Sequence, residues 1–276
     1  MRVTLAGNAF GDTPLEQVAQ LMKTVGIRHL ELGFGTNIKE KDEWSEAQAL
    51  LHRFGIEIAG LSVSARFEPG GYATAQREII QAVEIAALCG AKWVNTYAAQ
   101  THCTGAEDAV REHAARLLPC VEAAADRGIV LLMESELSLS EGNPSRLPET
   151  AVAVVEQVDS PYFKLTYEPV NLFLSSGVAW SQAYETLRNH IAHVHLKDVA
   201  KCTPALRAQY PRHRVWKGWD GEYICMPLGA GELPLDRILD RLKTDDYDGL
   251  LTLEPFTWPE PYRQGIAYLR KQGVIS

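Results

Sequence analysis

Two kinds of hydrophobic pattern alternate along the whole chain. Short apolar runs of strand length are separated by longer segments in which apolar residues recur at helical spacing. We predict strands at residues 2–6, 29–33, 56–63, 92–97, 129–134, 163–168, 191–199 and 249–254. The helices predicted between and after them cover 14–25, 41–54, 73–88, 106–127, 146–158, 180–189, 233–242 and 261–271. Eight strands alternating with helices predict an α/β fold with a parallel sheet, closed as a single (β/α)8 or TIM barrel.

Local signals place the start and the end of the first helix. Thr13 is predicted as its N-cap, with Pro14 at the first helical position and Glu16 at the third, and Gly26 ends the helix. By contrast, residues 200–232 show no clear period, which is typical of a long functional loop. Neither a linker nor low-complexity sequence interrupts the pattern, so residues 1–276 are expected to form one domain.

The composition limits the kind of partner that the protein can have. At 276 residues the chain has the length of one complete α/β barrel, and 46% of its residues are hydrophobic, which is ample for a core. The 27 basic and 35 acidic residues give a formal charge of −8 without a basic stripe. We therefore expect a small-molecule substrate, with no nucleic acid and no membrane as partner.

The cysteines and the N-terminus indicate the compartment. Five scattered cysteines form no CxxC pair, which argues against a disulfide framework or a cysteine zinc site. The N-terminus lacks the apolar run of a signal peptide, and no stretch reaches the roughly 18 apolar residues of a membrane span. A soluble, cytoplasmic protein is the expectation.

Potential metal ligands stand at the ends of four successive predicted strands: Glu134, Glu168, His195 and Glu254. In a barrel these ends converge on one mouth, where three carboxylates would repel one another unless a cation lay between them. We predict one divalent ion, with Mn²⁺, Mg²⁺ or Co²⁺ favoured by the oxygen-rich set and catalytic Zn²⁺ as an alternative. For each carboxylate alone, capping a helix or pairing with a lysine is the competing explanation.

Several motifs carry a family resemblance over essentially the whole chain. They are LLMESE, the ExxN of TYEPVNL, HVHLKD, PLGAGELP and the terminal TLEPF. With them the chain resembles the xylose isomerase-like barrel superfamily, in particular the sugar isomerases and epimerases typified by tagatose and psicose 3-epimerases. The resemblance implies metal ligands at the same four positions. It also implies a possible homodimer or homotetramer.

The chain departs from the family pattern at two places. The family more often has aspartate where this chain has Glu168, and often histidine where it has Asn171, which cannot act as a general base. A related branch, the apurinic/apyrimidinic endonucleases, carries extra zinc-binding histidines at the third and fourth strand ends. Those ends read LSVS and NTYA here, so a DNA-repair role is not expected.

The resemblance implies a reaction as well as a site. A metal bound to a sugar carbonyl and its neighbouring hydroxyl acidifies the adjacent C–H. Glu134 and Glu254 are then implied as the catalytic pair on opposite sides of the substrate, one removing a proton and the other returning one. This predicts a metal-dependent sugar or polyol isomerase or epimerase. A dehydratase acting on a ketoinositol-like polyol is the alternative, and a non-catalytic carbohydrate-binding barrel is a third possibility.

Residues around the predicted site are candidates for contact with the substrate. We predict substrate binding by Lys197, Lys201, Asn171, Trp216 and Trp258, with Lys201 lying where the 3-epimerases carry an arginine. Arg214 and Trp219 are further candidates to cap the site, and Glu136 and Glu141 to reach substrate hydroxyls. His193, deeper than His195 on the same strand face, is expected to make buried hydrogen bonds, and Glu31 to brace the barrel or bind a hydroxyl.

Overall fold

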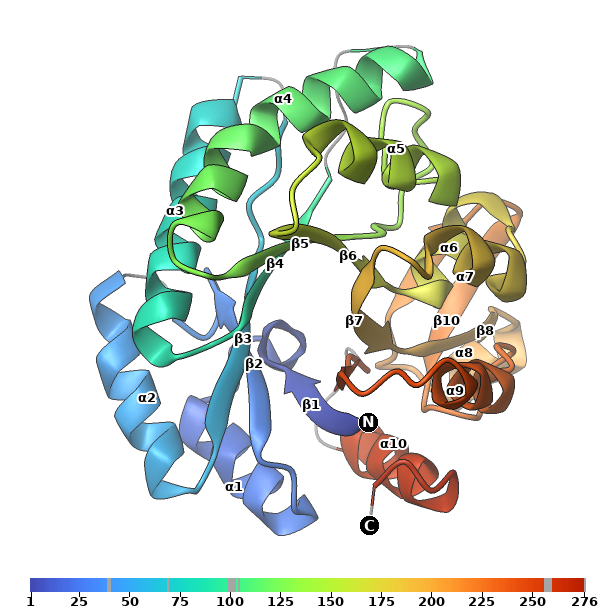
Figure 1. Ribbon diagram of the computed structural model, residues 1–276. Helices are drawn as coiled ribbons and strands as arrows, with labels where there is room; N and C mark the ends of the chain where they lie inside the picture. The colour runs from blue at the N-terminus through green and yellow to red at the C-terminus, as the bar shows by residue number, and fades with distance from the viewer. Residues whose placement is uncertain (39–40, 69, 99–102, 104, 256–259, 276) are drawn as a thin grey trace.

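The computed structural model describes residues 1–38, 41–68, 70–98, 103, 105–255 and 260–275 (Figure 1). Eight parallel strands close into a barrel in the order β1-β11-β7-β6-β5-β4-β3-β2. They are β1 (Arg2–Ala6), β2 (His29–Phe34), β3 (Glu57–Val63), β4 (Trp93–Tyr97), β5 (Val130–Glu134), β6 (Phe163–Tyr167), β7 (Ile191–Leu196) and β11 (Leu250–Leu253). The closed parallel barrel confirms the predicted fold class.

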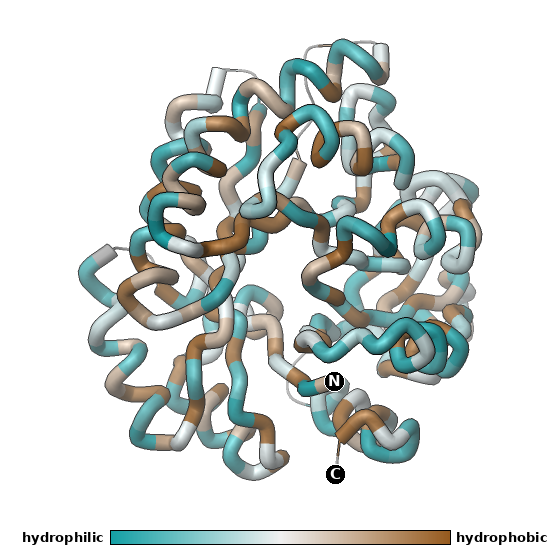
Figure 2. Tube along the Cα trace, in the orientation of Figure 1, coloured by the Kyte–Doolittle hydropathy of each residue, from teal (hydrophilic) through white to brown (hydrophobic). Residues whose placement is uncertain are grey.

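Helices cover the outside of the barrel (Figure 1). They are α1 (Leu15–Val25), α2 (Trp44–Arg53), α3 (Tyr72–Cys89), α4 (Ala106–Ala125), α5 (Pro148–Val158), α6 (Pro169–Ser176), α7 (Trp180–Leu187), α9 (Leu235–Thr244) and α10 (Glu260–Lys271), with short 3-10 turns η1 (Gly7–Phe10) and η2 (Lys41–Glu43). Hydrophobic and hydrophilic residues interchange along these helices in Figure 2. This is the pattern of a helix with one face on the barrel and one in water.

The first helix begins one residue later than predicted. Pro14 has an extended backbone and forms the N-cap, Leu15 is the first helical residue, and no side chain caps the helix, so the predicted capping by Thr13 is wrong. The Pro14 carbonyl instead accepts the first backbone hydrogen bonds, from Gln17 and Val18. The end of the helix is as predicted, because Gly26 adopts the left-handed conformation at φ 76°.

The segment predicted as a long irregular loop is ordered structure. It contains the end of β8 (Asp198–Lys201) together with α8 (Pro204–Gln209), β9 (Val215–Gly218) and β10 (Gly221–Met226), and the three strands form an antiparallel sheet in the order β8-β10-β9. Alternate residues of this sheet, among them Ala200, Ile224 and Met226, form a small core of their own. Strands this short give too few alternations to be recognised from sequence.

Asp198 joins this small sheet to the barrel. Its buried carboxylate accepts backbone hydrogen bonds from Val199, Gly229, Gly231 and Leu233. A β-carbon at Gly231 would lie 2.2 Å from an Asp198 oxygen, so only glycine fits there. The PLGAGELP motif is therefore a turn built around one carboxylate, which directs the chain from the small sheet into α9.

None of the helices in the described part of the chain combines the length and the apolar character that a membrane crossing requires.

Candidate active site

A cavity of about 450 Å³ opens at the carboxyl ends of the barrel strands. Glu134 is the last residue of β5, and Glu254 directly follows β11. Of the residues predicted for the site, Glu134, Glu254, Asn171, Lys197 and Trp216 line this cavity. The structure therefore brings together at one place side chains that are up to 120 positions apart in the sequence, as the strand-end rule requires.

His195, near the end of β7, faces the two carboxylates at the base of the cavity. Its Nδ1 lies 3.3 Å from Glu134 Oε2 and 3.9 Å from Glu254 Oε2. This nitrogen is buried and forms an ion pair with Glu134, although the geometry is not that of a hydrogen bond. The separations are close to the roughly 3 Å between donor atoms that share one divalent ion at ligand distances of about 2.1 Å. Glu134, His195 and Glu254, called the metal triad below, therefore fit a divalent cation.

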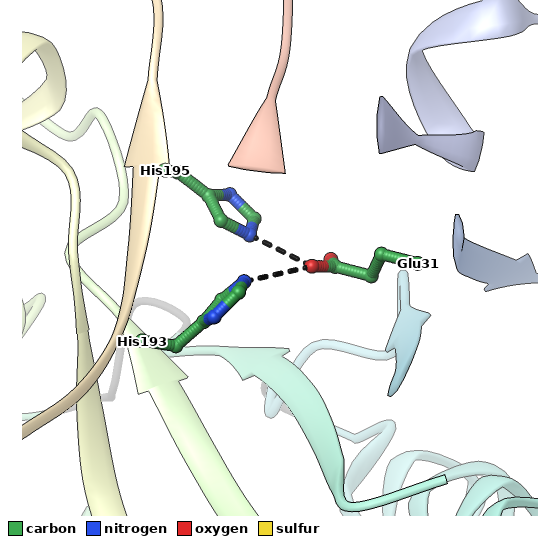
Figure 3. A group of neighbouring side chains, drawn as sticks. All are labelled: Glu31, His193 and His195. Carbon is green, nitrogen blue, oxygen red and sulfur yellow. Dashed lines mark hydrogen bonds and ion pairs between the residues drawn. The ribbon is translucent and has the colours of Figure 1, made fainter. Parts of the chain in front are cut away.

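The other ring nitrogen of His195 points to the back of the site. His195 Nε2 lies 3.1 Å from Glu31 Oε2, and His193 Nε2 reaches the same oxygen at 3.1 Å (Figure 3). All three side chains are buried. This confirms a buried hydrogen-bonding role for His193, while Glu31 turns out to contact the histidines rather than line the cavity.

Amide side chains hold Glu134 in place. Asn95 Nδ2 donates to Glu134 Oε2 at 2.8 Å, and Asn171 Nδ2 donates to Oε1 at 3.1 Å. Burial alone would raise the pKa of Glu134, but the charges of His195 and Lys197 and the Asn95 hydrogen bond outweigh it. The pKa of Glu134 therefore lies below its ordinary value, and the carboxylate is ionised in the metal-free protein.

Glu254 has the opposite tendency. Burial and the neighbouring charge of Glu134 raise its pKa, although Lys197 opposes this rise from a distance of 3.3 Å. Asn8 Nδ2 donates to its other oxygen at 3.4 Å. Two carboxyl groups whose environments move their pKa values apart are the usual arrangement of an acid and a base.

Glu168 lies beside the metal triad but is engaged elsewhere. It is the N-cap of α6, where its oxygens accept from the backbone of Val170 and Asn171 at 3.2 and 2.6 Å. Lys197 Nζ lies 3.3 Å from its Oε2. Both competing explanations for a strand-end carboxylate thus apply to this residue. Burial raises its pKa to about 7. Its predicted role as a fourth metal ligand stays a prediction.

The predicted substrate contacts divide into two groups. Asn171, Lys197 and Trp216 line the cavity together with Arg214 and Glu136. Lys201 is not among the lining residues: its ammonium pairs with Asp220 at 2.7 Å, beside the turn between β9 and β10, and its predicted contact with the substrate stays a prediction. Trp219 and Glu141 are exposed and also lie outside the cavity lining, and Trp258 lies outside the described residues.

Sequence reasoning missed several residues of the cavity. Asn8, Arg66 and Tyr97 line it, and Asn95 supports Glu134 from behind. Arg66 forms an ion pair with Glu136 at 2.5 Å. The sequence signal that indicates Asn95 and Tyr97 is the polar stretch NTY at the end of the fourth strand. Polar residues inside a buried barrel strand need hydrogen-bond partners, so they are expected to face other polar groups.

The fold and the site agree with a comparison against protein families. The model of the xylose isomerase-like TIM barrel family matches residues 19–272, and the chain belongs to this family. A comparison of the sequence with curated proteins finds no match.

Solved structures with the same fold have low sequence identity to this chain. D-allulose 3-epimerase from Methylomonas sp. is 13% identical, with a TM-score of 0.75 over 100% of this chain and 98% of that one. The probable 3-DHS dehydratase from Bacillus anthracis is 17% identical, with a TM-score of 0.73 over 98% and 99%. A xylose isomerase-like protein from Mycobacterium smegmatis in complex with magnesium is 16% identical, with a TM-score of 0.75 over 99% and 96%. At such identities the likeness shows the fold alone.

Proposed function

We propose that the protein is a divalent-metal-dependent sugar or polyol isomerase or epimerase. The observation that carries the proposal is the convergence of one ligand atom each from Glu134, His195 and Glu254, all within 4.8 Å of one another, at the base of an open cavity. Buried carboxylates held so close together favour a bound cation between them. The epimerases among the proteins of similar fold support the same reaction class.

The metal triad would hold the ion, and Glu168 is the proposed fourth ligand. An ion bound there supplies Lewis acidity, which makes the C–H next to a substrate carbonyl more acidic. The oxygen-rich donors favour Mn²⁺, Mg²⁺ or Co²⁺, with Zn²⁺ as an alternative.

The chain's own carboxylates would move the proton. Glu134 is ionised and fixed by Asn95 and Asn171, so it suits removal of the proton. Glu254, whose pKa is raised, suits its return. Return to the opposite face of the same carbon gives epimerisation, and return to the neighbouring carbon gives isomerisation.

One contact supports a second candidate, a dehydratase of a polyol. The ammonium group of Lys197 lies in the cavity lining 3.3 Å from Glu254. A fixed positive charge beside a carboxylic acid can stabilise a hydroxyl group as it leaves a substrate. The same proton abstraction at Glu134 would then end in loss of water.

Deuterium exchange tests the proposal. The Mn²⁺-loaded protein is incubated in D₂O with a panel of ketopentoses, ketohexoses and a ketoinositol, and the products are followed by NMR and ultraviolet absorption. We expect deuterium at a carbon next to the carbonyl, absent with Glu134→Gln and retained with the matched exposed variant Glu141→Gln. An enone product identifies the dehydratase. Binding of a sugar without exchange or elimination contradicts both and indicates a carbohydrate-binding barrel.

A further inference from the structure

The residues behind His195 point to a role that the strand-end pattern does not assign. We propose that Glu31 is the positioning residue of the metal site: it holds His195 in the orientation and protonation pattern that present Nδ1 to Glu134 and Glu254. The inference rests on the metal site of the proposed function. Glu31 itself does not line the cavity.

Three groups converge on a single oxygen of Glu31. Oε2 is 3.1 Å from His195 Nε2, 3.1 Å from His193 Nε2 and 3.0 Å from the hydroxyl of Thr252 (Figure 3 shows the two histidines). Glu31 comes from β2, the histidines from β7 and Thr252 from β11. Each of the four is at most 1% exposed. Water therefore does not compete for this oxygen.

The hydrogen-bond chemistry fixes where the proton of His195 lies. A carboxylate only accepts, so each group that reaches Oε2 must donate to it. His195 therefore holds a proton on Nε2, and a metal ion can take the place of a proton on Nδ1, which is the form that a metal ligand needs. Nδ1 faces the other two members of the metal triad, 3.3 Å from Glu134 Oε2 and 3.9 Å from Glu254 Oε2.

The surroundings also fix the orientation of the two rings. The ring of His193 lies 4.6 Å from that of Trp93 and 5.1 Å from that of His195, measured between centroids. Thr252 stands opposite His195 in the register of β11 and β7, and its hydroxyl lies 2.7 Å from His193 Nε2. A flip of His195 would take the Nε2 proton away from Glu31 and leave this buried carboxylate with one donor fewer.

Glu31, His193 and His195 are also close enough to hold an ion themselves. Their contacts favour hydrogen bonding at Oε2 of Glu31, because both histidines and Thr252 lie within hydrogen-bond distance of this oxygen. The other oxygen, Oε1, has no hydrogen bond to a described residue. Donation of the outer nitrogen of a metal-binding histidine to a carboxylate raises the basicity of the ligand, and loss of such partners typically weakens metal binding about 10–100-fold.

Mn²⁺ titration by calorimetry, with the metal alone as ligand, tests the effect on affinity. Glu31→Gln keeps the size of the side chain but places an amide donor among the histidines. We expect Mn²⁺ to bind about 10–100-fold more weakly to this variant. Thr252→Val is the matched control, since it removes a neutral donor to the same oxygen and should change affinity less than about threefold. Equal Mn²⁺ affinity of Glu31→Gln and the wild type would overturn the proposal.

A second measurement uses the wild-type protein and therefore does not depend on whether a Glu31 variant folds. In ¹⁵N NMR spectra of the wild-type protein loaded with ¹¹³Cd²⁺, we expect the metal coupling at Nδ1 of His195 and the proton on Nε2. Coupling at Nε2 would contradict the role assigned to Glu31. A separate comparison with Glu31→Asp extends this test: the variant should give mixed protonation of His195 if Glu31 positions the ring, and an unchanged pattern if Glu31 only supports the barrel.

His195→Ala separates this inference from the proposed function. If His195→Ala binds Mn²⁺ as the wild type does, the metal site itself is wrong and both proposals fail. If His195→Ala loses Mn²⁺ but Glu31→Gln does not, only the positioning role fails. If both weaken binding and no sugar exchanges deuterium, the positioning role stands while the proposed reaction does not.

Discussion

His195 separates two polar layers that differ in access to the cavity rather than in burial. The rear layer, Glu31, His193 and Thr252, is fully buried, and its groups bond one another around one oxygen. In the front layer, Glu134 and Glu254 are also about 1% exposed, yet the nitrogen that faces them makes no hydrogen bond to a described residue. Burial alone therefore does not distinguish scaffold from binding site. Missing hydrogen bonds do not distinguish them either, because Oε1 of Glu31 in the rear layer also has none to a described residue. The difference is that Glu134 and Glu254 line the cavity, whereas the rear layer does not.

The largest effect is expected from removing the base in the front layer. Glu134→Gln keeps an oxygen for Asn95 but lacks the charge that a proton acceptor needs, so the exchange rate should fall about 10²–10⁴-fold. Rates of deuterium incorporation under Mn²⁺ saturation measure this. If the rate falls less than tenfold while Mn²⁺ stays bound, the base is another residue and the front layer has been assigned wrongly.

Lys197 and His195 balance the negative charge of the front layer when no metal is bound. The ammonium of Lys197 lies 3.3 Å from both Glu168 and Glu254 and is 4% exposed. Lys197→Met leaves buried carboxylates without this charge, so the free energy of unfolding should fall by about 3 kcal/mol at neutral pH. Urea unfolding measures it. Mn²⁺ should restore more stability to this variant than to the wild type, because the ion neutralises Glu254.

The control for this prediction is Lys217→Met. Lys217 is an exposed lysine of β9, two residues before the hairpin turn, and its replacement should change stability by less than about 0.5 kcal/mol. A loss at Lys197 no larger than at Lys217 would mean that the front carboxylates do not depend on the ammonium.

His113 shows that a buried nitrogen without a hydrogen bond need not mark a binding site. Both of its ring nitrogens are buried without a hydrogen bond to a described residue, yet it lies on α4 and does not line the cavity. Its neighbour is the Phe67 ring, 5.4 Å away. Here an unpartnered nitrogen marks a cost to stability and not a binding site.

Burial lowers the pKa of His113 to about 4, well below the value of about 6.5 in the unfolded chain. The unfolded state then takes up the proton first, so this contribution to stability is complete above pH 6.5 and is lost as the pH falls towards 4. The loss amounts to at most about 3 kcal/mol. His113→Phe should show a flatter dependence of unfolding free energy on pH between 4 and 6.5. An unchanged slope would contradict the assignment.

The smallest effect is expected at Lys201. Its ammonium is held by Asp220 in the β9–β10 hairpin, away from the cavity lining. Lys201→Gln should therefore leave Mn²⁺ affinity and the exchange rate within about twofold of the wild type. A tenfold loss of exchange would instead support the predicted contact between Lys201 and the substrate, at the position where the 3-epimerases carry an arginine. The hairpin would then have to rearrange when substrate binds.

Much of the fold could be predicted because its signals are local. Each strand and helix carries its own period, and the rule for parallel strands then selects Glu134, His195 and Glu254 as neighbours at one mouth. The same local reasoning failed for residues 200–232, where four-residue strands such as β8 and β9 give no usable period. It also could not decide between the roles of Glu168, since capping α6 and binding a metal demand the same residue at the same place.

By itself, the sequence determined the barrel, the strand ends that meet and the residue types offered there, because side-chain direction follows from the position of each residue in its own strand. Only the tertiary structure decided which atoms face one another. The register that sets Thr252 opposite His195 joins strands more than fifty residues apart, and the closure of the barrel brings Glu31 across from β2. Those long-range alignments place Nε2 of His195 against Glu31 and Nδ1 against Glu134 and Glu254. Such contacts depend on distances between strands, which no local sequence pattern contains.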